Sequence, residues 1–394
     1  MTQKRLKLSW LLLGSLIAST GTSFIWPLTT VYMHDYLHQT LTLAGIVLFV
    51  ESVLMIGGSY LGGYIYDHFN YRPWLLGSIG ASLISMFLLI FFNGWPLYPL
   101  LLLVNGFGGA IANTIINALA TTIKHHDAAY VFNMMYFAAN CGGVVLGTFI
   151  VGFVVKYNIR YVFVVTFILF VFFWLIAQRH YRVPRKVAVP EKTAATDPLL
   201  PKKTPVFAVW IVCGLLLAYL MIELGYSQWQ SNLAVYMQSL GIGLNKYSYL
   251  WTINGIIIVI GQPLINYLEL HFEINGYHKV YGGFLLFILG FGSLIFAKDY
   301  PHFILSMVIV TLGGEVIAFP TIPALVASLS SEAEKGKYQG FVSISASLGH
   351  AIGPLLGGVV IEFASYEVLF EGLTFLIVIA GGVLSMIITW FKKI

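Results

Sequence analysis

The stretch QRHYRVPRKVAVPEKTAATDPLLPKKTP, from Gln178 to Pro205, differs sharply from the rest of a largely apolar chain. It is rich in prolines and basic residues and has no apolar stripe at helical spacing. This composition predicts a solvated linker rather than a helix. Six long apolar runs precede the stretch and six follow it, so the linker predicts a chain built from two halves.

The composition of the chain indicates a membrane protein. Charged residues make up only 9% of the 394 residues and hydrophobic residues 58%, with a mean hydropathy of +0.85. Soluble domains carry about 25% charged residues, so a soluble globular protein is excluded. Runs of about 20 apolar residues can cross a bilayer as helices, whereas a membrane barrel shows short alternating strands. We predict an all-α polytopic membrane protein with twelve transmembrane helices, at residues 8–33, 42–66, 74–93, 97–123, 129–156, 160–181, 206–238, 246–270, 279–297, 301–328, 338–364 and 367–391.

The lysines and arginines predict the orientation of these helices. With the N-terminus inside, only 4 of the 21 basic residues fall in outer segments, and the remainder lie in inner ones. This asymmetry follows the positive-inside rule and predicts a multi-pass protein of the cell (plasma) membrane with cytoplasmic N- and C-termini. The first apolar run is too long for the core of a cleavable signal peptide, so we expect it to be retained.

The two halves resemble each other weakly. The triplet VYM at Val31–Met33 recurs at Val235–Met237, and the pair Gly143 and Gly147 recurs as Gly353 and Gly357 at a similar offset. Matching features at similar offsets predict a duplicated six-helix unit, the build of many secondary transporters. We therefore predict two pseudo-symmetric six-helix bundles, with an N-terminal bundle at 1–181, a cytoplasmic linker at 182–205 and a C-terminal bundle at 206–394.

The loop after the second predicted helix carries a family signature. It reads GGYIYDHFNYRPW, from Gly62 to Trp74, and places Asp67 four residues after Gly63, with Arg72 beyond the turn. This pattern resembles the signature loop of the major facilitator superfamily, although His68, Asn70 and Tyr71 replace the usual Arg, Gly and basic residue. The resemblance implies the superfamily fold, alternating access around a central cavity, and a conformational switch formed by Gly63, Asp67 and Arg72. The alternative is an ordinary solvated turn with a helix-end acid.

Three further segments indicate a subfamily: LLLVNGFGGAIANT (Leu101–Thr114), TLGGEVIAFPTIPAL (Thr311–Leu325) and EKGKYQGF (Glu334–Phe341). They are similar to drug:proton antiporters, especially lactococcal-type multidrug exporters. The chain departs from that pattern in two places. Leu102 stands where many of these antiporters have Arg, and the fifth predicted helix has glycines without the usual Gly-Pro pair.

Glu51, Glu223 and Glu315 lie within predicted helices, and no lysine or arginine falls in the interior of any of them. An ionised carboxylate in hydrocarbon costs several kcal/mol, so a protonated, neutral acid is the favoured state when it is shielded from water. Such a group can bind and release protons as its access to water changes, and we predict a proton-coupling role for all three. The alternative is a structural hydrogen bond to a neighbouring helix. For His350, another titratable group within a predicted helix, and for Glu51, both interpretations stay open.

A substrate cavity would also need aromatic and amide walls, because aromatic faces attract lipophilic cations. Many of the aromatic residues will simply pack or face lipid. The residues that we expect to line the cavity are Trp26, Tyr32, Asn105, Tyr136, Asn140, Trp229, Trp251 and Phe319.

These observations favour a proton-coupled exporter of lipophilic, often cationic, small molecules, present as a monomer. Alternatives are a transporter of the same fold for a sugar, metabolite or lipid, and a receptor that does not transport. An enzyme is disfavoured, because the helices show no nucleophile–base pair and the chain no phosphate-binding loop. Cys141 and Cys213 have no metal-ligand spacing. We therefore expect no metal, no cofactor and no nucleic-acid partner.

Overall fold

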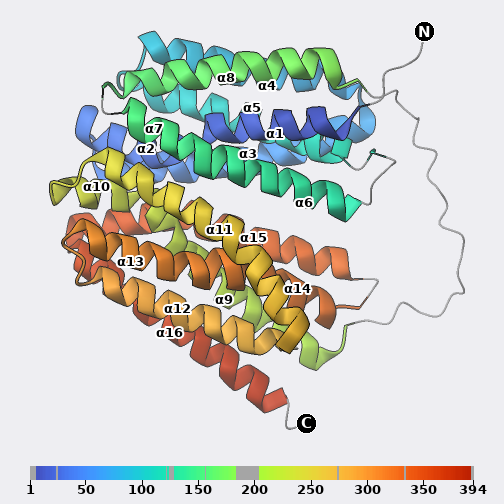
Figure 1. Ribbon diagram of the computed structural model, residues 1–394, viewed down its shortest axis with the longest axis vertical. Coiled ribbons are helices and arrows are strands. Elements are labelled where there is room, and N and C mark those ends of the chain that lie inside the picture. The colour runs from blue at the N-terminus through green and yellow to red at the C-terminus, as the bar shows by residue number, and fades with distance from the viewer. Residues whose placement is uncertain are drawn as a thin grey trace, which may run out of the picture. The chain divides into compact units, whose positions relative to one another are not determined.

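The computed structural model describes residues 6–23, 25–120, 122–123, 128–155, 157–182, 204–272, 275–331 and 334–391. Within these residues the chain is almost entirely helical and contains no strand (Figure 1). Most of the predicted linker at 182–205 lies outside the described residues. The helices occur in the order that the apolar runs predict.

The helices before the linker correspond to the first six predicted spans. The first span comprises several consecutive helical segments, and the fifth changes from an α-helix to a wider π-helix and back. The elements are α1 (Leu8–Thr22), α2 (Ile25–Val31), the π-helix η1 (Tyr32–Tyr36), α3 (Leu41–His68), α4 (Tyr71–Phe91), α5 (Leu97–Ala120), α6 (Ala128–Ala139), the π-helix η2 (Asn140–Gly147), α7 (Thr148–Val154) and α8 (Arg160–His180).

The helices after the linker correspond to the other six spans. The seventh span is divided at residue 231, and the tenth contains a π-helical segment in its middle. The elements are α9 (Val206–Gln230), α10 (Asn232–Ser239), α11 (Leu244–Phe272), α12 (Gly276–Leu294), α13 (Tyr300–Thr311), the π-helix η3 (Leu312–Ala318), α14 (Phe319–Leu329), α15 (Lys335–Phe363) and α16 (Tyr366–Phe391).

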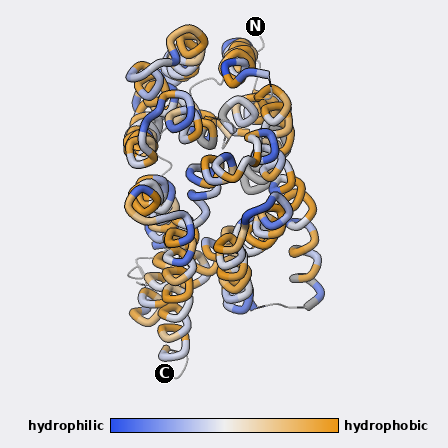
Figure 2. Tube along the Cα trace, turned by 90° about the vertical axis from the view of Figure 1, so that its left-hand side faces the viewer, coloured by the Kyte–Doolittle hydropathy of each residue, from blue (hydrophilic) through white to orange (hydrophobic). Residues whose placement is uncertain are grey.

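Nine helical segments in the described part of the chain are long and apolar enough to cross a membrane. Hydrophobic residues run along most of their length (Figure 2). The predicted spans 8–33, 129–156 and 279–297 are outside these nine. Each of the first two is formed by several shorter helical segments, and the third corresponds to α12, which has 19 residues. These findings confirm a polytopic all-α protein.

The chain divides into two compact units. One comprises Met1–Lys186 and Ala234–Ile256, and the other comprises Val187–Leu233 and Ile257–Ile394. The division therefore crosses α11 rather than falling only at the linker. The sequence boundaries at 181 and 206 stay a prediction about the two six-helix bundles.

The same helix pairs pack together in both units. In the first unit, α1 packs against η2 and α8, and α4 packs against α5 and α8. In the second unit, α9 packs against α15 and α16, and α12 packs against α13 and α16. In each case the first span of the half contacts the fifth and sixth, and the third contacts the fourth and sixth. This correspondence agrees with the internal repeat of the sequence.

A close helix contact in the second unit joins α9 and α15. A Cβ atom on Gly353 would lie 2.9 Å from the backbone oxygen of Leu224, and one on Gly349 would lie 2.9 Å from the backbone nitrogen of the same residue. The Gln228 amide donates to the carbonyl oxygen of Gly353 at 2.7 Å. Small residues permit this approach because lipid supplies no hydrophobic force between helices.

The start of α9 is anchored to the segment between α14 and α15. The backbone N–H of Thr204 donates to the Glu334 carboxylate at 2.9 Å, and the N–H of Ser331 donates to the Thr204 hydroxyl at 3.1 Å. The Thr204 backbone N–H beside Glu334 holds the pKa of that carboxyl below its usual value. The last residues of the predicted linker are therefore attached to the second unit.

The α9–α15 contact predicts that one added methyl group destabilises the protein at Gly353 but not at Gly340. Gly353→Ala would press a methyl group on the Leu224 carbonyl, and overpacking of this kind costs about 1–3 kcal/mol. We expect a lower melting temperature for the purified protein in detergent. Gly340→Ala, on the same helix with open space around it, is the matched control and should not destabilise. Equal melting temperatures for both variants would contradict the close contact.

Candidate functional site

Glu315 lies in the π-helical segment η3, between α13 and α14. Two features of the sequence accompany the wide turn. Gly313 meets Gly283 of α12 so closely that a Cβ on Gly313 would lie 2.8 Å from the Gly283 carbonyl oxygen. Pro320 and Pro323 follow, and neither can donate a backbone hydrogen bond. Isolated π-helical turns inside α-helices are frequent at functional sites.

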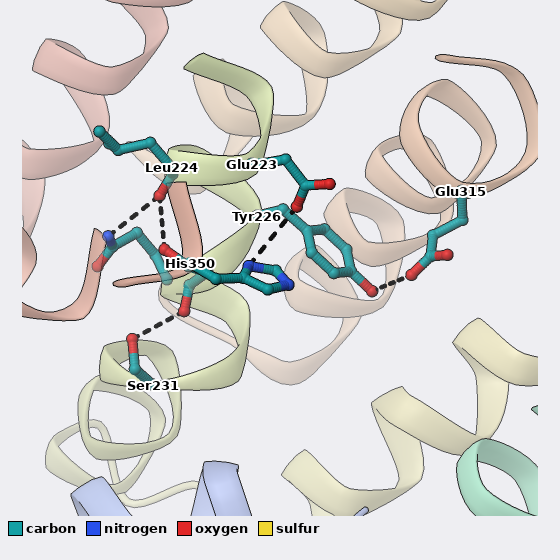
Figure 3. Close-up of polar contacts among 8 residues, drawn as sticks. Glu223, Leu224, Tyr226, Ser231, Glu315 and His350 are labelled. Carbon is teal, nitrogen blue, oxygen red and sulfur yellow. Dashed lines mark hydrogen bonds and ion pairs between the residues drawn. The ribbon is translucent and has the colours of Figure 1, made fainter. Parts of the chain in front are cut away.

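The backbone and the side chain of Glu315 are both bound by neighbouring helices. A π turn directs the carbonyl of residue 315 toward the N–H of residue 320, which is a proline and has none. The Gln262 amide of α11 donates to this carbonyl instead, at 2.8 Å. The Tyr226 hydroxyl of α9 donates to the carboxyl oxygen Oε1 (Figure 3). Glu315 is therefore held between α9 and α11.

Glu223 lies one turn before Tyr226 on the same helix and is buried, with 4% of its surface exposed. Its Oε2 atom lies 3.6 Å from the His350 Nδ1 atom of α15. The Tyr226 ring stacks beside the His350 ring, with centroids 6.5 Å apart. Figure 3 shows the two contacts side by side, His350 toward Glu223 and Tyr226 toward Glu315. We call Glu223, Tyr226, Glu315 and His350 the acidic cluster.

Aromatic rings pack against one side of the acidic cluster. Phe319, the first residue of α14, makes edge contacts with Tyr226 at 5.4 Å and with Tyr219 at 5.7 Å between ring centroids. It also packs near Phe287 of α12. Phe319, predicted for the cavity, is therefore brought to the acids. Trp229 lies two turns beyond Glu223 on α9 and is fully buried.

The chemistry of the acidic cluster follows from its apolar surroundings. The sequence places no lysine or arginine in the interior of these helices, and an unpaired carboxylate in a low-dielectric interior is costly. The neutral, protonated acid is the favoured state when the cluster is closed to water. The two acids, the phenol and the imidazole form two neighbouring donor–acceptor pairs, Tyr226 with Glu315 and His350 with Glu223. Among the described residues, no group of three or more His, Cys, Asp and Glu could hold a metal ion.

Glu51 lies in the first unit, whereas the acidic cluster belongs to the second. It is buried on α3 against α5, and a Cβ on Gly106 would lie 2.8 Å from its Oε1 atom. Its Oε2 atom has no hydrogen-bond partner among the described residues. The neighbouring Asn105, predicted for the cavity, is also buried, and its Oδ1 atom likewise lacks a partner. The first unit therefore holds an acid and an amide with unused hydrogen-bonding capacity.

Two of the other predicted cavity residues belong to the first unit. Tyr32 of η1 is buried in the first unit against Tyr98 and Phe163, with ring centroids 4.5 and 5.7 Å away. Trp251 of α11 belongs to the same unit and lines a small cavity of about 10 Å³ with Thr148. The side chains of Trp26, Tyr136 and Asn140 lie outside the described residues.

The predicted conformational switch is described in part. Gly63 lies in α3 with the Thr114 methyl group 4.0 Å from where a Cβ would be. The Asn70 side chain caps α4, accepting from the backbone N–H of Arg72, and the Arg72 guanidinium donates to the Gln178 carbonyl at 3.1 Å. The side chain of Asp67 lies outside the described residues, so the switch stays a prediction.

Three residues of the site had no role predicted from the sequence. Tyr226 and Gln262 were visible only as polar residues within apolar helices, and His350 only as a titratable residue whose role was open. The spacing of Tyr226, three residues after Glu223, places both on one face of α9. No sequence signal indicates that Glu315 and His350, from other helices, meet that face.

Apolar helices in two similarly packed units, with buried acids at mid-helix, are the architecture of secondary membrane transporters. The Major Facilitator Superfamily model matches residues 11–277 and 276–393, nearly the whole chain. The chain belongs to the major facilitator superfamily.

Similar proteins cover the chain over most of its length. It is 34% identical to YttB, an uncharacterised MFS-type transporter of Bacillus subtilis, over 94% of this chain and 92% of YttB. It is 22% identical to the multidrug resistance protein MdtH of Shigella boydii, over 89% of this chain and 85% of MdtH. The fold matches solved structures of a variant peptide transporter POT (TM-score 0.82, 15% identity, covering 98% of this chain and 95% of the other) and of the nucleoside transporter NupG (TM-score 0.77, 14% identity, 98% and 99%).

Tyr226→Phe tests the hydrogen bond that joins α9 to η3. The variant removes the donor to Glu315 and leaves a part-buried acceptor without its partner, which costs about 1–3 kcal/mol. We expect a lower melting temperature in detergent. Tyr281→Phe, an equivalent change on α12 at the edge of a shallow apolar groove, is the control. If Tyr226→Phe melts like the native protein, the hydrogen bond does not stabilise the fold.

Proposed function

We propose that this protein is a proton-coupled secondary transporter that exports lipophilic, often cationic, small molecules by alternating access. The observation that supports the proposal is the acidic cluster. Two acids on different helices, the buried Glu223 and the half-buried Glu315, lie on either side of Tyr226, which bonds Glu315, and no lysine or arginine in the interior of these helices neutralises them. Intramembrane acids of this kind are by default functional.

In the proposed cycle, the cluster binds either protons or a cationic substrate. With the acids protonated, the site is neutral and can be closed to water at little cost. When the site opens to the cytoplasm, the protons leave and a lipophilic cation is attracted to the carboxylates and to the rings of Tyr226 and Phe319. Protons arriving from outside then displace the cation outward.

The movement that alternates access belongs to the proposal as well. The six-helix bundles at 1–181 and 206–394 would rock about the central cavity, with both termini in the cytoplasm. Gly63, Asp67 and Arg72 would stabilise one conformation at the cytoplasmic side. The close glycine contacts of α9 with α15 and of η3 with α12 keep the cluster's helices together during this movement.

Two comparisons agree with this proposal. Relatives named for multidrug resistance match about nine-tenths of the chain, and the superfamily assignment makes secondary transport the class of activity. Lipophilic cations are therefore the first substrates to test.

Glu223→Gln combined with Glu315→Gln should abolish uphill transport, because an amide cannot exchange a proton. We would measure movement of a fluorescent lipophilic cation such as ethidium in proteoliposomes with an imposed pH gradient. Glu367→Gln, at the start of α16, is the matched control and should transport normally. Uphill transport that survives in the double variant would sink the proposal, and flux that is independent of the gradient would indicate a uniporter.

Glu51→Gln should change the coupling rather than the binding of the cation, because Glu51 belongs to the first unit and the acidic cluster to the second. We expect ethidium affinity to be retained within about threefold, a difference of under 1 kcal/mol. We also expect fewer protons to be exchanged for each cation. A pH-sensitive dye inside the vesicles measures this ratio. An unchanged ratio would show that Glu51 has only a structural role.

A further inference from the structure

The two members of the His350–Glu223 pair differ in exposure. The His350 side chain is 34% exposed, whereas that of Glu223 is 6% exposed. The imidazole is therefore the more exposed member of the pair, and the carboxyl is the buried one. A neutral imidazole is both a donor and an acceptor of protons, one at each ring nitrogen.

The backbone holds His350 at this position. The preceding residue, Gly349, lies directly against Glu223 and Leu224 of α9. One turn further on, the amides of Gln228 and Asn232 donate to the carbonyls of Gly353 and Pro354 at 2.7 and 3.3 Å. The distance of 3.6 Å between Nδ1 and Oε2 is therefore set by a tightly packed helix pair. A side-chain shift of under 1 Å brings the two atoms within hydrogen-bonding distance.

The other titratable groups around the imidazole do not compete with it as donors and acceptors of protons for Glu223. Tyr226 stacks beside the ring and bonds Glu315, and Tyr219 hydrogen-bonds the Glu223 side chain. Each of these phenols is engaged with a carboxyl. Glu223 and Glu315 are the titratable acids of α9 and η3 at this point. The imidazole is thus the partly exposed titratable group in contact with Glu223.

We propose that His350 is the proton-transfer residue of the Glu223 carboxyl. On unloading, the O–H bond at Glu223 Oε2 breaks and an N–H bond forms at His350 Nδ1. The N–H bond at His350 Nε2 then breaks, and that proton passes to water. The reverse sequence loads the carboxyl, so one proton moves and no other reactant is needed. The inference rests on Glu223 exchanging protons, as proposed above, but not on the identity of any substrate.

The test measures proton transfer without a substrate. The full-length protein in lipid nanodiscs is subjected to a rapid pH jump, and the Glu223 carboxyl is followed by time-resolved infrared spectroscopy. The band is identified by its loss in Glu223→Gln. In His350→Asn we expect the final amplitude to be kept and the rate to fall about 100-fold, the lower end of the usual contribution of a positioned acid–base group.

Added imidazole should restore the rate in His350→Ala, because the small molecule can occupy the space of the missing ring. His278→Asn, an exposed histidine of α12, is the matched control and should react like the native protein. A native rate in His350→Asn overturns the inference. A loss of rate and amplitude together in both variants, without recovery in imidazole, also overturns it and assigns His350 a structural role.

The transport assay separates this inference from the proposed function. If ethidium is not moved but His350→Asn slows the carboxyl band, the inference stands and the proposed substrate class is wrong. If ethidium is moved by the pH gradient and the band is unaffected in His350→Asn, the export proposal stands and the inference is wrong. If no band belonging to Glu223 responds to pH, the inference is overturned.

Discussion

The close approach of α9 and α15 is the contact on which the site of the second unit depends. Three glycines of α15 at four-residue spacing, Gly349, Gly353 and Gly357, lie directly against α9. Without water in the bilayer, the two backbones are joined by packing and by hydrogen bonds from Gln228 and Asn232. Because this contact fixes the two helices in register, it also fixes His350 beside Glu223.

A second constraint is the free-energy cost of an ionised carboxylate in an apolar interior. Glu223 and Glu315 lie among apolar helices that carry no lysine or arginine in their interiors, so their ionised forms are favoured only when water or a cation can reach them. The phenol of Tyr226 and the amide of Gln262 bind the Glu315 side chain and backbone. Glu315 is therefore held in place by hydrogen bonds, while the charge state of the cluster depends on access to water.

Much of the fold was predictable, because the bilayer leaves few solutions for an apolar chain. The hydrophobic runs, the linker and the basic residues predicted a polytopic helical protein in two halves, and the helix order and repeated packing agree with it. The interruptions were harder to predict. The π-helical segments η2 and η3 accompany glycine contacts with other helices and, in η3, nearby prolines. The prolines can be recognised from the sequence of one helix, whereas the contacts between helices cannot.

From the sequence alone, the class of protein could be predicted and Glu223 and Glu315 could be recognised as candidate site residues, because a carboxyl in the middle of an apolar helix is conspicuous at any register. The sequence could not predict which side chains contact those two acids. Whether Glu223 faces His350, and whether Tyr226 reaches Glu315, depends on the rotation of α9 against α15 and of η3 against α9, which hydrophobic residues on all sides of a membrane helix leave unspecified. In the folded chain, these rotations are set by close backbone contacts, which form where glycines of two distant segments come together.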